Sequence, residues 1–157
     1  MLKIKIPGYK TLNIQHLVLD FNGTIAKEGK LIEGVKEKLD KISGIIEVHI
    51  LTADTFGTVR DEFSGNEINI EIIDENQLSI DYKKEIIKSL GKESVIAIGN
   101  GNNDSKMLKT AELGIAIIGA EGAAINSLWN SEVAVNSIID ALNLITNKKG
   151  LIATLRR

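Results

Sequence analysis

The chain has 157 residues, 43% of them hydrophobic and 25% charged, which predicts one globular domain with a core of its own. No apolar run approaches the roughly 20 residues of a membrane-spanning helix and no signal segment opens the chain, so we expect a cytoplasmic protein with no membrane partner. Its 19 Lys and Arg against 21 Asp and Glu, with 4% aromatic residues, offer nucleic acid neither a basic surface nor a stacking platform.

Strand and helix patterns alternate along the whole chain, with no linker or internal repeat. Residues 2–6 alternate apolar and polar side chains, turn at Pro7-Gly8, and lead through a second extended stretch into a buried strand over 16–20. The later predicted elements are helices over 31–42, 54–63, 79–90, 103–112, 123–129 and 138–145, and strands over 45–51, 68–72, 95–98, 115–118 and 133–135.

This alternation predicts an α/β fold, a parallel sheet with helices on both faces. In open sheets of this kind, ligands bind at the carboxyl ends of the strands. Polar side chains follow several predicted strands, and we expect them to converge on one crevice. They are Asp20 and Asn22, Thr52, the loop over 99–104, and Lys83 at the start of the next helix.

Asp20 ends an all-apolar strand and precedes a turn that contains Gly23. A carboxylate in this position can bind a metal ion, or attack phosphorus and form an aspartyl-phosphate intermediate. The alternative is that Asp20 caps a turn or a helix, which is the commonest role of an isolated aspartate. Taken alone, its position favours the capping role.

Thr52 ends another apolar strand, where its hydroxyl and nearby backbone N–H groups, including that of Ala53, could hold phosphoryl oxygens. It could equally cap the helix predicted after it. Lys83 lies in the first turn of its helix, where a cation is unfavourable unless an anion is close, and this hints at a bound ligand. Lys84 is the competing candidate, and a solvated helix face is the alternative for both lysines.

The loop over residues 99–104 reads Gly-Asn-Gly-Asn-Asn-Asp and can bring Asp104 close to Asp20. Two carboxylates suit Mg²⁺, which commonly takes one or two of them together with waters and substrate phosphate oxygens. A dinucleotide-binding loop is the rival interpretation. It is weak because the third glycine of that fingerprint is missing here.

Cysteine, histidine and tryptophan give no further site in the sequence. With no cysteine, thiolate metal sites are excluded, and two histidines are too few for a histidine-rich metal cluster. His16 and His49 lie in or beside apolar strand patterns, which predicts packed or edge positions. Trp129 and Met107 are expected in the core.

The segment Asp20-Phe21-Asn22-Gly23-Thr24 resembles motif I of the haloacid dehalogenase superfamily, Asp-x-Asp-Gly-Thr. Thr52, Lys83 and the loop over 99–104 match the three later motifs of that family in order. Residues 83–118 are most similar to the phosphorylation domain of P-type ATPases. The resemblance extends over roughly residues 15–146, and four ordered motifs are far more specific than any one of them.

The resemblance implies a Rossmann-like sheet and a Mg²⁺-dependent phosphohydrolase or phosphotransferase that acts on a phosphorylated substrate through an aspartyl-phosphate on Asp20. It implies that the backbone carbonyl of Asn22 is one of the metal ligands. The metal-binding residues would be Asp20, Asn22, Asn100 and Asp104, and the phosphate-binding residues Thr52, Ala53, Lys83 and Asn103.

Two positions depart from the family pattern. Asn22 stands where phosphatases have an acid/base aspartate, and such help is typically worth roughly 10²–10⁴-fold in rate, so we expect slow turnover. Asn100 stands where a metal-binding aspartate is usual, which should weaken Mg²⁺ binding. The alternative is a non-catalytic relative that binds phosphate or a phosphorylated ligand and acts through regulation or association.

The spacing of the motifs leaves no room for a cap domain. Between Asp20 and Thr52, and again between Thr52 and Lys83, about one helix and one strand fit. An open site needs a cover, which could be a large substrate or a neighbouring subunit of a homo-oligomer. Ion pumping is excluded, because it requires transmembrane helices. The last residues, 151–157, either pack on the domain or a neighbour, or fray.

Overall fold

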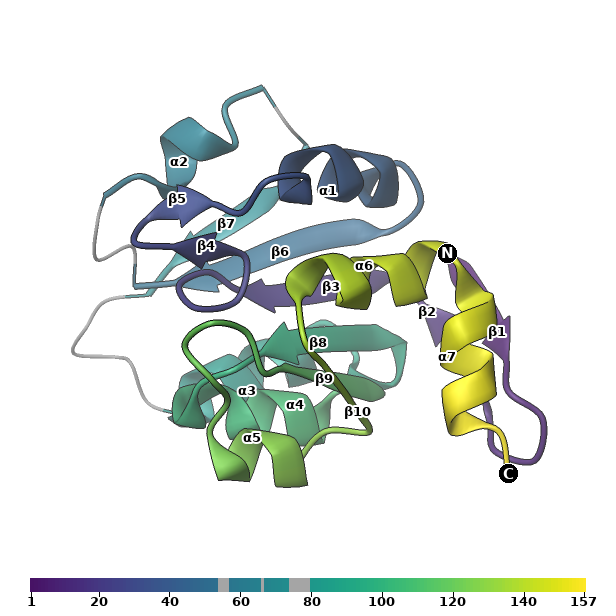
Figure 1. Ribbon diagram of the computed structural model, residues 1–157. Coiled ribbons are helices and arrows are strands. Elements are labelled where there is room, and N and C mark those ends of the chain that lie inside the picture. The colour runs from purple at the N-terminus through teal and green to yellow at the C-terminus, as the bar shows by residue number, and fades with distance from the viewer. Residues whose placement is uncertain (54–56, 66, 74–79) are drawn as a thin grey trace.

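The computed structural model describes residues 1–53, 57–65, 67–73 and 80–157 (Figure 1). At its centre is a six-stranded sheet in the order β10-β9-β8-β3-β6-β7, with every neighbouring pair parallel. The predicted α/β parallel sheet is confirmed. Its strands are β3 (His16–Asp20), β6 (Glu47–Thr52), β7 (Asn69–Ile72), β8 (Val95–Gly99), β9 (Leu113–Ile117) and β10 (Val133–Val135).

Helices cover both faces of this sheet, because both faces of its strands are apolar. Leu17 and Leu19 belong to the larger hydrophobic core, with side chains of α1, α6 and α7, whereas Val18 belongs to a smaller core with side chains of α3 and α4. The helices are α1 (Val35–Ser43), α2 (Val59–Glu62), α3 (Ile80–Ser89), α4 (Ser105–Thr110), α5 (Ile125–Trp129), α6 (Ile138–Thr146) and α7 (Lys148–Leu155), with 3₁₀ turns η2 (Lys92–Ser94) and η3 (Asn102–Asp104).

The strand order reverses next to β3. From this central strand the chain first builds β6 and β7 on one side, and then crosses to build β8, β9 and β10 on the other. Where the strand order of a parallel sheet reverses, a crevice lies at the carboxyl ends of the strands, here those of β3 and β8. The predicted site residues Asp20 and Asn100 lie at the two sides of this crevice.

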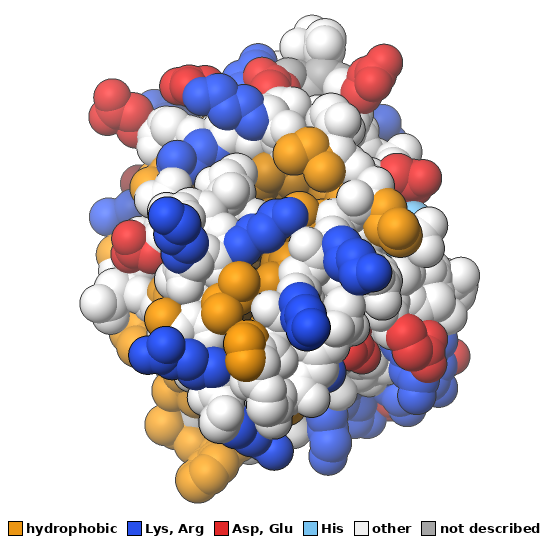
Figure 2. Space-filling view, turned by 90° about the vertical axis from the view of Figure 1, so that its right-hand side faces the viewer, with side chains coloured by type: hydrophobic (Ala, Val, Ile, Leu, Met, Phe, Trp, Pro, Cys, Tyr) orange, Lys and Arg blue, Asp and Glu red, His pale blue; other side chains and the backbone are white. Residues whose placement is uncertain are grey.

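The N-terminal segment forms a separate hairpin. β1 (Leu2–Lys5) pairs antiparallel with β2 (Thr11–Ile14), so the second extended stretch pairs with the first instead of running on as part of β3. Helix α7 packs against β1, its Leu151 is fully buried, and the N–H of Arg157 donates to the carbonyl of Pro7. The C-terminal segment therefore packs on this domain and does not fray. Figure 2 shows the side of the molecule that carries β1, β2 and α7. On this surface, lysine and arginine side chains surround a strip of hydrophobic side chains.

The helix expected over 31–42 begins only at Val35. Ahead of it, β4 (Ala26–Lys27) and β5 (Lys30–Leu31) form a small hairpin, whose turn holds Glu28 and Gly29 at positive φ. Leu31 fits the helical spacing but belongs to β5, so that start was wrong. This hairpin and α1 are the elements between β3 and β6, all of them described, and no cap domain is inserted there.

Two other predictions need comment. Trp129 was expected in the core but is 81% exposed at the end of α5, whereas Met107 is buried as predicted. The helix predicted over 54–63 is found as α2, and its predicted first residues, 54–56, lie outside the described residues, as does residue 79. Within the described part of the chain, no helix is both long enough and apolar enough to cross a membrane.

Candidate active site

Asp20 lies at the buried carboxyl end of β3, followed by a tight turn. The turn closes with hydrogen bonds from the N–H of Gly23 to the carbonyl of Ala26 and from the N–H of Thr24 to the carbonyl of Phe21. Gly23 has a φ of 78°, and a Cβ there would lie 2.7 Å from a carboxylate oxygen of Glu121. Glycine is therefore favoured at this point by its positive φ, a conformation that other residues rarely adopt.

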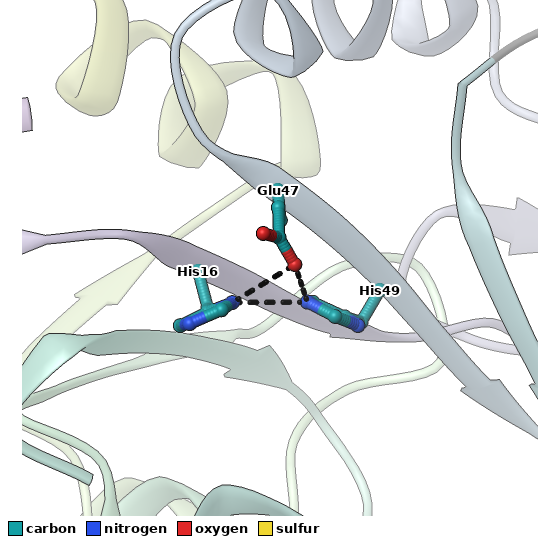
Figure 3. Close-up of side chains that lie close together, drawn as sticks. All are labelled: His16, Glu47 and His49. Carbon is teal, nitrogen blue, oxygen red and sulfur yellow. Dashed lines mark hydrogen bonds and ion pairs between the residues drawn. The ribbon is translucent and has the colours of Figure 1, made fainter. Parts of the chain in front are cut away.

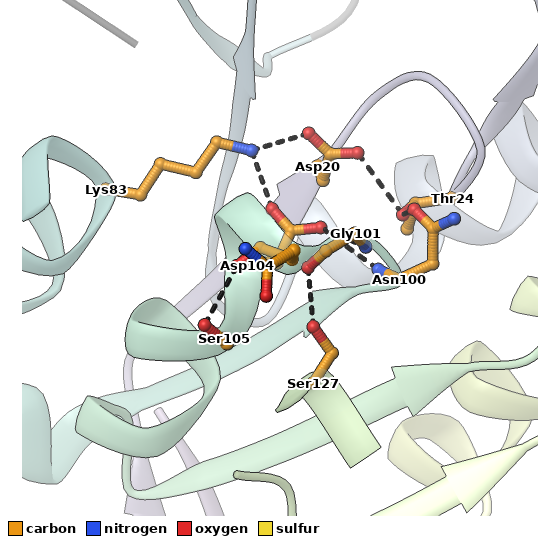
Figure 4. A network of polar contacts seen from close by, with 9 residues as sticks. Asp20, Thr24, Lys83, Asn100, Gly101, Asp104, Ser105 and Ser127 are labelled. Carbon is orange, nitrogen blue, oxygen red and sulfur yellow. Dashed lines mark hydrogen bonds and ion pairs between the residues drawn. The ribbon is translucent and has the colours of Figure 1, made fainter. Parts of the chain in front are cut away.

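Lys83 joins two carboxylates that come from different elements. Its Nζ lies 2.6 Å from Oδ1 of Asp20 and 2.6 Å from Oδ1 of Asp104, and all three side chains are buried (Figure 4). Lys84, the competing candidate, points away and pairs with Asp81 and Glu85 on the helix surface. Of the two lysines, it is therefore Lys83 that lines the cavity beside the carboxylates.

This triad carries one positive and two negative formal charges. Burial raises the pKa of Asp20, the charge of Asp104 raises it further, and Lys83 offsets part of the effect, so the pKa is about 6 against an ordinary 3.8. Burial alone would lower the pKa of Lys83, but the two carboxylates outweigh it and raise that pKa above the ordinary value. Lys83 therefore stays protonated, and the cluster keeps an excess of negative charge.

The loop after β8 fixes Asp104 rigidly. Oδ2 of Asp104 accepts hydrogen bonds from the backbone N–H groups of Asn100, at 3.0 Å, and Gly101, at 2.9 Å. A Cβ on Gly99 would lie 2.6 Å from the carboxyl carbon of Asp104, so only glycine lets the carboxylate come this close. The hydroxyl of Ser127 donates to the carbonyl of Gly101 and so anchors the loop to α5.

Asn100 links the loop after β8 to the turn after β3. Its Oδ1 accepts a 3.1 Å hydrogen bond from the hydroxyl of Thr24, which also lies 3.4 Å from Oδ2 of Asp20. Its Nδ2 donates to the carbonyl of Gly122 at 3.3 Å. Thr24 is fully buried. It belongs to motif I but had no role in the sequence prediction, because its partner is 76 residues away.

A cavity of about 330 Å³ opens over this network. All predicted site residues line it except Asp104, which is wholly buried next to Lys83 and the backbone of Asn100. The sequence prediction missed Gly101 and Glu121. Glu121 lies in the loop after β9, so the strand-end rule that selected the other residues could also have selected it. The lining residues are Asp20, Asn22, Thr52, Ala53, Lys83, Asn100, Gly101, Asn103 and Glu121.

The donor set fits a small oxygen-preferring cation such as Mg²⁺. Among the described residues, Oδ1 of Asn22 is buried without a hydrogen-bond partner, so it is free to accept from a water or contact a cation. Oδ2 of Asp20 faces the same region and lies 3.4 Å from the hydroxyl of Thr24. The excess negative charge of Asp20 and Asp104 over Lys83 favours a cation here.

Comparison with known proteins supports the same family. Residues 82–128 match the haloacid dehalogenase-like hydrolase family. The chain is 47% identical over 78 residues to uncharacterized protein MJ0073 of Methanocaldococcus jannaschii, a match that covers 47% of this chain and 84% of that protein. It is also 29% identical over 106 residues to a probable copper-exporting P-type ATPase of Archaeoglobus fulgidus, covering 67% of this chain and 13% of the ATPase.

Solved phosphatases share the fold at low sequence identity. The cobalt-bound deoxy-D-mannose-octulosonate 8-phosphate phosphatase of Haemophilus influenzae has a TM-score of 0.65 at 14% identity, covering 92% of this chain and 94% of that one. A phosphoserine phosphatase in its apo form has a TM-score of 0.67 at 14% identity, covering 84% and 99% of the two chains. The motifs meet in one cavity on this shared fold, and the family match over residues 82–128 and the shared fold are both consistent with a member of the haloacid dehalogenase superfamily.

Proposed function

We propose that this protein is a Mg²⁺-dependent phosphohydrolase or phosphotransferase that acts through an aspartyl-phosphate on Asp20. The observation that carries this proposal is the buried contact of Lys83 with both Asp20 and Asp104 beneath an open cavity. Structural carboxylates are normally neutralised by their partners, whereas these two keep an excess negative charge where a cation and a phosphoryl group would enter.

In the first step, a carboxylate oxygen of Asp20 attacks phosphorus, and the bond from phosphorus to the leaving oxygen breaks with its electron pair on that oxygen. In the second step, a water oxygen attacks the same phosphorus, and the bond from phosphorus to the Asp20 oxygen breaks with its electron pair on that oxygen. The carboxylate is restored, and inorganic phosphate leaves with the two protons of the water. Lys83 keeps Asp20 oriented throughout. When bound, Mg²⁺ would neutralise charge between the carboxylates and the phosphoryl oxygens.

Three residues at the rim complete the phosphate-binding region. Thr52 is buried at the end of β6, and Ala53 follows it at the cavity wall, so a hydroxyl and a backbone N–H lie beside the space that phosphoryl oxygens would occupy. Asn103 faces the same cavity from η3. These neutral donors add hydrogen bonds without changing the charge of the site.

Asn22 sets the expected rate. It lines the cavity where family members carry an aspartate, and an amide neither gives nor takes a proton near neutral pH. The leaving oxygen then departs as an anion and the attacking water has no base at this position. We therefore infer slow turnover, fastest for phosphates whose leaving group is a weak base.

The assay is phosphate release from acyl, aryl and alkyl phosphates with and without Mg²⁺, using an Asp20→Asn variant as control. We expect Mg²⁺-dependent release by the native chain and none by the variant. Equal release by both proteins would remove Asp20 from the mechanism.

A second candidate function is favoured by Asn100. Both ends of its amide are engaged, by Thr24 and by the carbonyl of Gly122, so it serves as a structural link where the family has a metal ligand. A site of this kind can bind a phosphorylated ligand without turning it over. Binding of inorganic phosphate with no release from any ester or acyl phosphate would select this function.

A further inference from the structure

Three side chains with metal-binding groups meet at the end of the sheet opposite to Asp20. His16 begins β3, and Glu47 and His49 lie two residues apart on the neighbouring strand β6. The strands are parallel, with His16 beside Glu47 and Val18 beside His49. Because alternate residues of a strand point to the same face, all three side chains emerge on one face of the sheet (Figure 3).

The ligand atoms of these residues converge on one point. Nδ1 of His16 lies 3.1 Å from Nε2 of His49, and Oε2 of Glu47 lies 3.5 Å from the first nitrogen and 3.7 Å from the second. Around a zinc ion with ligands at about 2.0–2.2 Å in tetrahedral directions, neighbouring ligand atoms lie about 3.3–3.6 Å apart. The three measured separations bracket that value.

A simple hydrogen bond explains only part of this geometry. One proton between the two imidazoles accounts for the 3.1 Å contact, but it leaves the carboxylate of Glu47 at 3.5 and 3.7 Å, beyond the usual hydrogen-bond range. The histidine side chains are only 15% and 14% exposed.

We propose that His16, Glu47 and His49 bind a zinc ion, or another transition metal that prefers nitrogen ligands, and that water fills the remaining coordination position. Two imidazoles and one carboxylate with an open fourth position are a common donor set for zinc. The count of only two histidines had argued against a histidine-rich cluster, but a mixed set needs no more. A bound ion would join β3 to β6 at the end of the sheet opposite to the phosphate site.

Glu47 is the best residue to test, because its side chain is 65% exposed and its replacement should leave the fold intact. Glu93 offers a matched control. It is 73% exposed in η2, directly before β8, at the same end of the sheet but outside the cluster. Untagged, chelator-treated Glu47→Gln and Glu93→Gln proteins are titrated with Zn²⁺, each also carrying Asp20→Asn to remove a carboxylate from the other site.

We expect one zinc ion per chain in the Glu93→Gln protein, and binding at least about 100-fold weaker in the Glu47→Gln protein, since even outer partners of metal ligands are worth 10–100-fold. Cobalt should give visible absorption bands only in the first protein. Circular dichroism of both metal-free proteins checks folding. Equal zinc affinity in the two variants, or no zinc bound by either, would overturn the proposal. Neither the zinc titration nor the cobalt spectrum depends on phosphate release, so this proposal and the proposed function are tested separately.

Discussion

Oδ1 of Asp20 lies 2.6 Å from Nζ of Lys83, which follows it by 63 residues in the chain, and neither group has appreciable access to solvent. The contact forms because β3 is central in the sheet and α3 lies in the helical layer on the face of the sheet that carries Val18. Asp104 makes the same contact from the other side, so one ammonium group serves two carboxylates.

Replacing Lys83 with methionine leaves two buried carboxylates without their cation. Removing one partner of a buried ion pair costs about 3–5 kcal/mol, so we expect a loss of that size in the free energy of unfolding, measured in urea. Lys84→Met is the matched control, since Lys84 is a surface neighbour on the same helix, and its effect should stay within about 0.5 kcal/mol. Similar losses of unfolding free energy in both variants would show that the buried ion pairs of Lys83 do not stabilise the fold.

Asp20 should make stability depend on pH. Its pKa is raised from 3.8 to about 6 in the folded protein, so between these values the folded state binds the proton more tightly than the unfolded state. Without Mg²⁺, the contribution of Asp20 to stability is therefore greatest below pH 4 and falls as the pH rises to about 6. Each pKa unit corresponds to about 1.4 kcal/mol.

The Asp20→Asn variant tests this directly. It removes the excess negative charge, so at pH 7.5 without Mg²⁺ it should be more stable than the native chain, by up to about 3 kcal/mol. Mg²⁺ should stabilise the native chain more than the variant. The measurement is the difference between their unfolding free energies from pH 4 to 8, in which the other titrating groups cancel. A difference that does not change with pH would show that Asp20 does not titrate in this range.

Gly99 should be required for the position of Asp104. A Cβ on Gly99 would lie 2.6 Å from the carboxyl carbon of Asp104, so Gly99→Ala must displace that side chain, and we expect at least about 2 kcal/mol of destabilisation. Gly44→Ala is the control, because Gly44 has an ordinary φ of −68° and its nearest neighbour would be at 3.7 Å. Thermal unfolding of both variants, with and without Mg²⁺, should show the loss only at Gly99.

The leaving-group preference tests the interpretation of Asn22. Asn22→Asp should supply a proton donor and raise turnover of alkyl phosphates more than that of aryl phosphates, by roughly 10²-fold or more. Glu121→Gln is measured beside it, because Glu121 and Asp20 are the carboxylates among the described residues that line the cavity. If only Glu121→Gln changes the ratio of the two rates, Glu121 supplies the proton to the leaving group, and the amide at position 22 does not determine the leaving-group preference.

The sequence predicts the sheet and most of the site because both follow from local rules. Apolar runs mark the buried strands, and residues after those strands, such as Asp20 and Thr52, must meet at one edge of a parallel sheet. Leu31 was misassigned because it continues the spacing of α1, while the turn at Glu28 and Gly29 is not visible as a pattern.

Other features depend on contacts between distant segments. The role of Thr24 comes from its hydrogen bond to Asn100, and the cluster of His16 and Glu47 needs the register of β3 against β6. Trp129 was misplaced because apolar character does not say which face of a short helix is covered. No local pattern contains this information.

The most direct test of the proposed function is to trap the intermediate on Asp20. The native chain and its Asp20→Asn variant are mixed with radiolabelled acetyl phosphate and Mg²⁺, quenched in acid, digested and mapped. Because Asn22 cannot activate water, the acyl-phosphate should persist long enough to be found, on the peptide that contains Asp20 and nowhere in the variant. Phosphate release by the native chain without label on that peptide, or equal label in both proteins, would contradict the proposed mechanism.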